Sequence, residues 1–137
     1  MFLVRSPLIT VFHDTLGYCF DSALRDMLGP SVRDSVYGLL ERSRIPRAEV
    51  ANRFDEAVDV LVRGFGAASR VLVHRTLVEL FGQYSLRLDF SYQDSLRDRL
   101  WRLKEQVVDS HIIPRRLQEA SWHDEASVLN RSNKSTA

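Results

Sequence analysis

Apolar residues recur at three- and four-residue steps along most of the chain, which is the spacing of one face of an α-helix. The first stripe consists of Leu8, Phe12, Leu16, Phe20, Ala23, Leu24, Met27 and Leu28. Ser6-Pro7 has the form of an N-cap followed by proline at the first helical position, whereas the β-branched run Ile9-Thr10-Val11 favours a start nearer Asp14. Gly29-Pro30 cannot continue the helix. We therefore predict a first helix that ends at Leu28.

A second helix is predicted after this break, because Ser31 can cap it and Asp34 stands three residues further on, in the capping-box position. Its inner face consists of Val32, Val36, Leu39 and Leu40. Gly38 lies inside this pattern at a cost of about 1 kcal/mol relative to alanine. We expect that Gly38 permits another helix to approach closely.

Two more helices follow Ile45-Pro46. The first runs from about Arg53 to the glycines Gly64 and Gly66, with an inner face of Phe54, Ala57, Val58, Leu61 and Phe65. The next, over residues 67–81, is apolar nearly all round, which is typical of a helix surrounded by others. We predict that it is the central and most buried helix.

Beyond Gly82, the residues from Leu86 to Tyr92 alternate between apolar and polar, which is a strand period. A single strand has no partner here, so we prefer an extended connector. Ser91 and Asp94 then have the spacing of an N-cap and its capping-box partner, as Ser31 and Asp34 do. A long helix is predicted to follow to about Asp109. The prediction is an all-α fold: a compact bundle of about five helices with a long C-terminal helix. Residues 1–122 are assigned to this single domain and residues 123–137 to a polar, disordered tail.

Composition limits the function classes. The 137 residues are 45% hydrophobic, and 19 basic side chains meet 18 acidic ones, for a net charge of +1. This balance excludes disorder by composition, disfavours a dedicated nucleic-acid binder and weakens self-repulsion. The single cysteine, Cys19, excludes a disulfide framework and predicts a reducing cytoplasm. No apolar run approaches the length of a membrane span, so we expect no membrane partner.

The sequence contains no motif for catalysis or cofactor binding. The histidines His13, His74, His111 and His123 have neither metal-ligand spacing nor a cysteine partner, and Gly64-Phe65-Gly66 lacks the lysine of a phosphate-binding loop. No nucleophile elbow marks a hydrolytic triad. We therefore predict no metal, no cofactor and no enzymatic activity.

Partner binding is the function that the pattern favours. The stripe Leu96, Leu100, Leu103 and Val107 forms a short heptad seam, and Trp101 widens it. The seam either covers the chain's own core or pairs with its copy in a two-fold homodimer.

Two alternatives to a helix-face interaction remain open. One is nucleic-acid binding by the cluster Arg42, Arg44, Arg47 and Arg53. The other is a pocket between helices for a small apolar ligand.

A recognisable order of helix faces and glycine stops runs through the middle of the chain: Ala23-Leu24-Arg25-Asp26-Met27-Leu28-Gly29, Val32-Arg33-Asp34-Ser35-Val36-Tyr37, Leu40-Glu41, Ile45-Pro46, Phe54-Asp55-Glu56-Ala57 and Phe65-Gly66. Over residues 20–82 it resembles the Nitrosopumilus output domain, a small helical family that is mainly archaeal. The resemblance implies a signalling or interaction role, with a signalling protein as partner, and carries over no catalytic residue. Arg44 stands where the family often has glycine.

Overall fold

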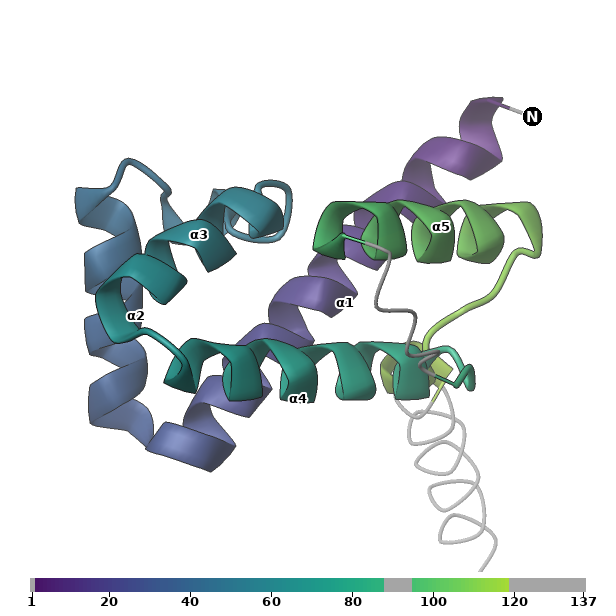
Figure 1. Ribbon diagram of the computed structural model, residues 1–137. Helices are drawn as coiled ribbons and strands as arrows, with labels where there is room; N and C mark the ends of the chain where they lie inside the picture. Colours follow the sequence, from purple (N-terminus) through teal and green to yellow (C-terminus); the bar gives the residue numbers. More distant parts are fainter. Residues whose placement is uncertain (1, 88–94, 119–137) are drawn as a thin grey trace, which may run out of the picture.

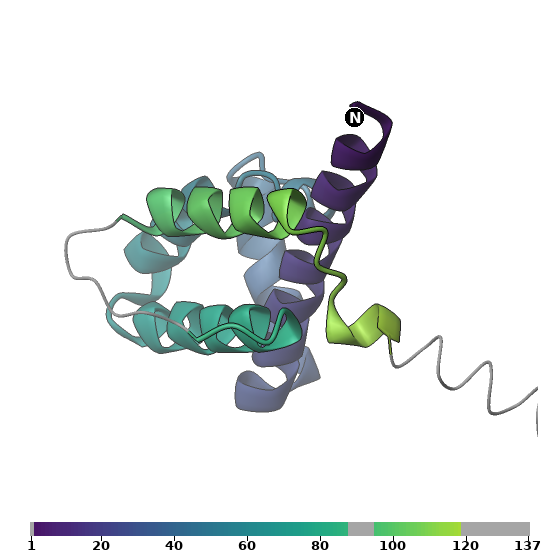
Figure 2. The ribbon, with the colours of Figure 1, turned by 90° about the vertical axis from the view of Figure 1, so that its right-hand side faces the viewer.

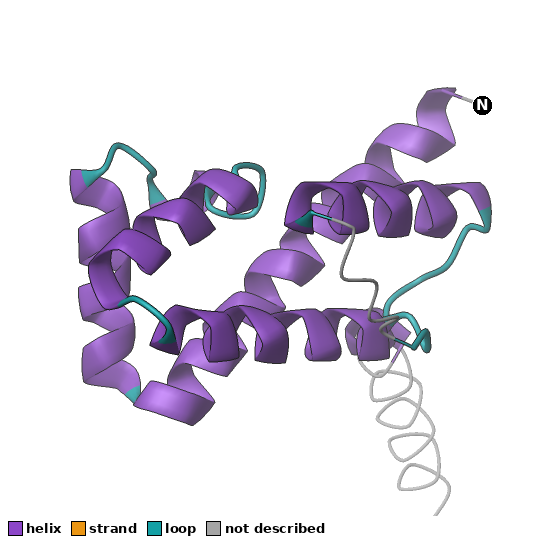
Figure 3. Ribbon diagram, viewed as in Figure 1, coloured by secondary structure: helices purple, strands orange, loops and turns teal. Residues whose placement is uncertain are grey.

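The computed structural model describes residues 2–87 and 95–118 and contains only helices and loops in these ranges (Figures 1 and 3). The labelled helices are α1 (Phe2–Leu28), α2 (Pro30–Arg42), the short 3₁₀ helix η1 (Arg47–Glu49), α3 (Phe54–Phe65), α4 (Ala68–Gln83) and α5 (Leu96–Asp109), and residues 115–118 are also helical. The all-α fold predicted from the periodicity is therefore confirmed. None of the described helices combines the length and the hydropathy needed to cross a membrane.

Helix α1 is the centre of the bundle, because α2, α4 and α5 all pack against it (Figures 1 and 2). Its buried face includes Phe12, Leu16 and Phe20, each 1% exposed. The prediction that the fourth helix is the central one was wrong. Helix α4 packs on α1 and α3, but Val71 and Val78 on its outer face are 57% and 44% exposed.

The start of α1 also differs from the prediction. The helix begins at Phe2 and includes Pro7, so neither Ser6 nor the region of Asp14 marks its first turn. Proline and β-branched residues disfavour a helix interior locally. The apolar face nevertheless continues through this region into the buried Phe12, and its packing outweighs the local preference.

The break between the first two helices is confirmed. Gly29 has a φ of 85°, in the left-handed region that favours glycine, and Pro30 occupies the first turn of α2. Ser31 is not the cap that we predicted. Because the helix starts at Pro30, Ser31 lies inside α2, and no side chain caps this helix by a hydrogen bond.

The close helix approach occurs at Gly64 and not at Gly38. A Cβ built at Gly38 would have no neighbour within 4 Å, whereas one at Gly64 would lie 2.9 Å from Cδ2 of Leu39. The prediction for Gly38 was therefore wrong. The absence of a side chain at Gly64 is what allows α3 to pack against α2.

Helix α5 begins after Ser95, whose hydroxyl accepts a hydrogen bond of 3.1 Å from the backbone N–H of Asp98. It has 14 residues, whereas α1 has 27, so the longest described helix is at the N-terminus. The predicted start at Ser91, and with it most of the predicted connector from Leu86 to Tyr92, lies outside the described residues.

The chain after α5 returns to α1 and α4. The backbone N–H of Arg116 donates to Oε1 of Gln83 at 2.8 Å, and its Nε donates to the hydroxyl of Thr15 at 2.9 Å. Thr15 has no exposed surface. This segment therefore closes one side of the core. The predicted tail, residues 123–137, and the end of the predicted domain lie outside the described residues.

Candidate binding surfaces

The heptad seam predicted as a partner surface lies largely inside the chain. Leu103 and Val107 are 2% and 1% exposed and belong to the hydrophobic core, and Leu96 and Leu100 are half-buried against it. Trp101, by contrast, is 59% exposed. Leu103 and Val107 thus cover the chain's own core, which is one of the two roles that the sequence left open for the seam. Among the five residues of the predicted surface, only Trp101 presents a large apolar area to solvent.

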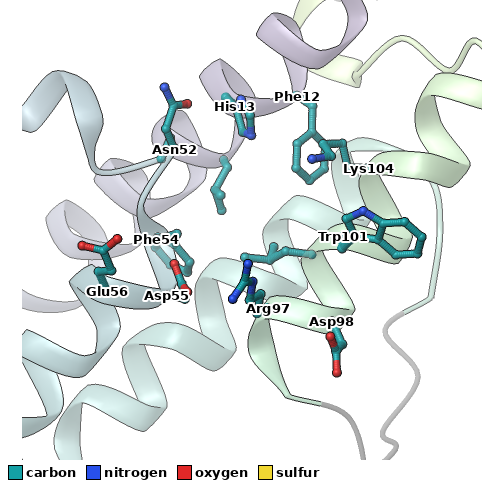
Figure 4. A pocket seen from close by; sticks show the side chains of 13 residues that line it. Phe12, His13, Asn52, Phe54, Asp55, Glu56, Arg97, Asp98, Trp101 and Lys104 are labelled. Atoms are coloured by element: carbon teal, nitrogen blue, oxygen red, sulfur yellow. The ribbon is translucent and has the colours of Figure 1, made fainter. Parts of the chain in front are cut away.

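Leu100 and Trp101 line a hollow of about 680 Å³ between α5, α1 and the beginning of α3, which we call the cleft (Figure 4). Its lining residues are Phe12, His13, Leu16, Ala51, Asn52, Phe54, Asp55, Glu56, Arg97, Asp98, Leu100, Trp101 and Lys104. The deepest of them are core residues, since Phe12, Leu16 and Phe54 are at most 2% exposed. The cleft therefore has an apolar floor and polar walls.

Charged groups of both signs line the cleft, and its two basic residues both come from α5. Helix α5 contributes Arg97 and Lys104, and α3 contributes Asp55 (Figure 4). Burial, and then the positive charge of Lys104, lowers the pKa of His13 below its usual value, while Asp14 opposes this shift. The His13 imidazole is thus favoured in its neutral form.

The arginine cluster predicted as the nucleic-acid alternative is largely engaged by carboxylates. The guanidinium of Arg47 lies 3.1 Å from Oδ1 of Asp21 and 4.3 Å from the ring centroid of Tyr37. Arg53 contacts Glu49 at 3.1 Å and Glu56 at 2.8 Å. Two of the four positive charges are therefore neutralised locally.

Arg42 and Arg44 are exposed and form no ion pair with the residues that the structure describes. The backbone of Arg44 has a φ of 67°, and its carbonyl accepts a hydrogen bond of 2.9 Å from Arg53. A left-handed conformation is one that glycine adopts without strain. Two free guanidinium groups do not make the basic stripe that nucleic-acid readers present.

A second hollow, whose lining residues the sequence did not identify, lies where the C-terminal end of α1, the beginning of α2, the end of α3 and the beginning of α4 meet. We call it the groove. It has a volume of about 130 Å³ and is lined by Met27, Leu28, Val32, Val36, Leu61, Phe65, Ala68, Ser69 and Leu72. No lining residue is charged, and Ser69 alone carries a polar side-chain atom.

Four residues of the groove are open to solvent. Met27 is 38% exposed, Leu28 44%, Val32 40% and Phe65 46%. The helical periodicity placed all four on apolar stripes, and it assigned Val32 and Phe65 to inner faces, which was wrong. They share a position within about one turn of the helix stops Gly29 and Gly66, where the neighbouring helices no longer cover them. Proximity to a stop is the feature of the sequence that could have identified them.

The remaining candidate chemistry adds no site. Cys19 is 1% exposed, and burial raises the pKa of its thiol to about 12, which suits a core residue. Within residues 2–87 and 95–118, no three side chains among His, Cys, Asp and Glu gather closely enough to hold a metal ion.

Comparison of the chain with family models, curated proteins and solved structures gave no match in any of the three.

Proposed function

We propose that this chain is a non-catalytic helical interaction module that forms a homodimer through the groove. The observation that carries the proposal is the exposure of Met27, Leu28, Val32 and Phe65 around one apolar hollow. A contiguous exposed apolar surface of this kind is typical of a protein-binding site. The resemblance to the Nitrosopumilus output domain implies an interaction role of the same class.

A second copy of the chain is the occupant that the groove fits best. A two-fold interface brings the same patch together from both subunits, so the patch must be complementary to itself. The groove has both required parts, because the exposed apolar side chains of Phe65 and Leu28 line the same hollow of about 130 Å³. That volume suits one large apolar side chain rather than a whole helix.

Electrostatics also favours self-association. The groove lining has no charged side chain, so closing it removes no ion from water. The chain as a whole carries a net charge of +1, which keeps the repulsion between two copies small. A dimer through α5 is less well supported, since Leu103 and Val107 already pack inside the chain.

Sedimentation velocity of the intact chain tests the proposal. We expect a dimer at tens of micromolar and a monomer for Leu28→Glu, because two copies of a buried, unpaired carboxylate oppose closure of the groove. Val78→Glu is the matched control: Val78 is also 44% exposed, but it lies on α4 outside the groove.

Three possible results distinguish a dimer through the groove, a dimer through α5 and a monomer. Dissociation by Leu28→Glu with an intact dimer in Val78→Glu supports the groove. An unchanged dimer in Leu28→Glu that Trp101→Ala dissociates would return the interface to α5. A wild-type chain that remains monomeric at 100 µM, a concentration of about the order at which weak specific interfaces assemble, would reject the homodimer.

A further inference from the structure

We infer that the cleft between α1, α3 and α5 is a binding site for a small aromatic zwitterion, a molecule with a planar ring, one anionic group and one cationic group. This site goes beyond the proposed function and does not depend on it, because the cleft and the groove share no lining residue. Its volume of about 680 Å³ lies within the range of small-molecule sites.

The aromatic part of the inference rests on Trp101. Its indole is 59% exposed at the edge of the cleft, and Leu100 on the same helix is half-buried beside it. Figure 4 shows the indole on the far side of the cleft from Phe54, so a planar ring can stack against it at the edge of the cleft. Burial of an otherwise exposed tryptophan makes such a contact favourable.

The charges of the ligand follow from the two walls. Arg97 and Lys104 stand seven residues apart on α5, and Asp55 stands on α3 across the hollow. Figure 4 shows the side chains of Arg97 and Asp55 directed toward each other from these walls. Neither Arg97, Lys104 nor Asp55 forms an ion pair within residues 2–87 and 95–118, so all three remain available to a ligand.

The other acidic groups of the cleft do not change this polarity. Glu56 is held by Arg53 through two hydrogen bonds, of 2.8 and 3.1 Å. Asp98 lies on the α5 wall, and in Figure 4 its carboxylate is on the side of Trp101 away from His13. The α3 wall therefore offers the unpaired Asp55 to a cation, and the α5 wall offers Arg97 and Lys104 to an anion. A ligand with both charges satisfies both walls.

Three indoles with the same ring and different charges test the inference by isothermal titration calorimetry: L-tryptophan (zwitterion), tryptamine (cation) and indole-3-propionate (anion). We expect L-tryptophan to bind most tightly, with a Kd of about 0.1–1 mM, which is the range for a ligand of this size without further specific contacts. Each singly charged indole leaves one wall unpaired and is expected to bind about tenfold more weakly.

Variants of the two walls separate their roles. Arg97→Gln is expected to weaken L-tryptophan and indole-3-propionate about tenfold and to leave tryptamine unchanged. Asp55→Asn is expected to weaken L-tryptophan and tryptamine and to leave indole-3-propionate unchanged. Arg70→Gln on the exposed face of α4 removes one positive charge outside the cleft and is the control.

Either of two outcomes would overturn the inference. If the three indoles bind with equal affinity, or if none binds at 5 mM, the cleft does not recognise a zwitterion. If Arg70→Gln weakens L-tryptophan as much as Arg97→Gln does, the effect comes from the overall charge and not from the cleft. The substituted side chains are exposed or half-buried, so thermal melting of each variant is expected to match that of the wild type.

Discussion

The groove and the cleft lie in the same bundle and differ in what they offer to a partner. The groove has about 130 Å³ and no charged lining residue, whereas the cleft has about 680 Å³ and charges of both signs. An apolar surface makes association favourable but gives a partner little orientation, and placed charges supply that orientation. The two hollows therefore differ in chemistry as well as in place: one is apolar, and the other combines an apolar floor with charged side chains.

Helix α3 takes part in both hollows. Phe54 at its beginning lies on the floor of the cleft, and Phe65 at its end lines the groove. Both belong to one apolar stripe, but Phe54 is 2% exposed and Phe65 is 46% exposed. Phe54 packs edge-on against Phe20 of α1, with ring centroids 5.5 Å apart. Coverage by a neighbouring helix, and not position on the stripe, therefore determines which phenylalanine stabilises the fold.

The largest effect is expected when these two phenylalanines are truncated. Phe54→Ala should lower the free energy of unfolding by about 3–5 kcal/mol, because it removes a buried ring and leaves a cavity. Phe65→Ala should lower it by less than about 1 kcal/mol, because much of this ring is already exposed. Urea unfolding measures both values.

A control keeps this comparison informative if Phe54→Ala does not fold. Phe54→Leu retains most of the buried volume and is expected to cost about 1–1.5 kcal/mol. Equal losses for the two alanine variants in a monomeric background would contradict the difference in burial between the two ends of α3.

An intermediate effect is expected at the turn that follows Phe65. Gly66 has a φ of 65° and a ψ of −140°, a conformation open essentially to glycine alone. Gly66→Ala should therefore lower the free energy of unfolding by about 1–3 kcal/mol. Gly82 lies inside α4, and a Cβ there would have no neighbour within 4 Å.

Gly82→Ala is the matched substitution for that test and should raise stability by up to about 1 kcal/mol, because alanine is the better helix former. Chemical denaturation of both variants gives the sign of each change. A stabilising Gly66→Ala would show that the turn beside the groove does not need a glycine.

The smallest effect is expected from pH. The stability of the fold should depend on pH through His13 in the cleft, whereas dimerisation through the groove should not. The pKa of His13 in the cleft is lowered by burial and by Lys104, so the folded chain takes up this proton less readily than the unfolded one. The contribution of His13 to stability is therefore present above the unfolded pKa of about 6.5 and is lost as the pH falls through the folded value.

Lys104→Gln removes one cause of this shift and is expected to raise the pKa of His13, as followed by NMR titration of the ring protons. The groove has no titratable lining residue, so the dimer constant is expected to stay the same between pH 5.5 and 7.5. A dimer that weakens in step with protonation of His13 would link the two hollows and contradict their separation.

Several features of the fold were predictable because they depend on local chemistry. The spacing of apolar residues identified the helices, and Gly29-Pro30 and Gly66 were recognised as stops because they permit or impose conformations that end a helix. The seam of α5 was predicted as an apolar face, but its sequence did not show whether that face meets the chain itself or a partner.

Other features depended on residues far apart in the sequence. The sequence placed Arg47 in a basic cluster, but Asp21, which is 26 residues away, lies 3.1 Å from it in the fold. It also suggested the fourth helix as the central one, although α1 has that place because three helices pack around it. Such contacts between distant segments leave no periodic trace in the sequence.

By itself, the sequence determined that this chain is helical, where several of its helices end and which face of each is apolar, because these properties follow from side chains within a few residues of one another. Only the tertiary structure decided which apolar faces are covered, and that Met27, Leu28, Val32 and Phe65 stay open beside one groove. It also brought Asp55, Arg97 and Trp101 around one cleft. The physical reason is that exposure is a property of the neighbours that packing supplies, and those neighbours come from elsewhere in the chain.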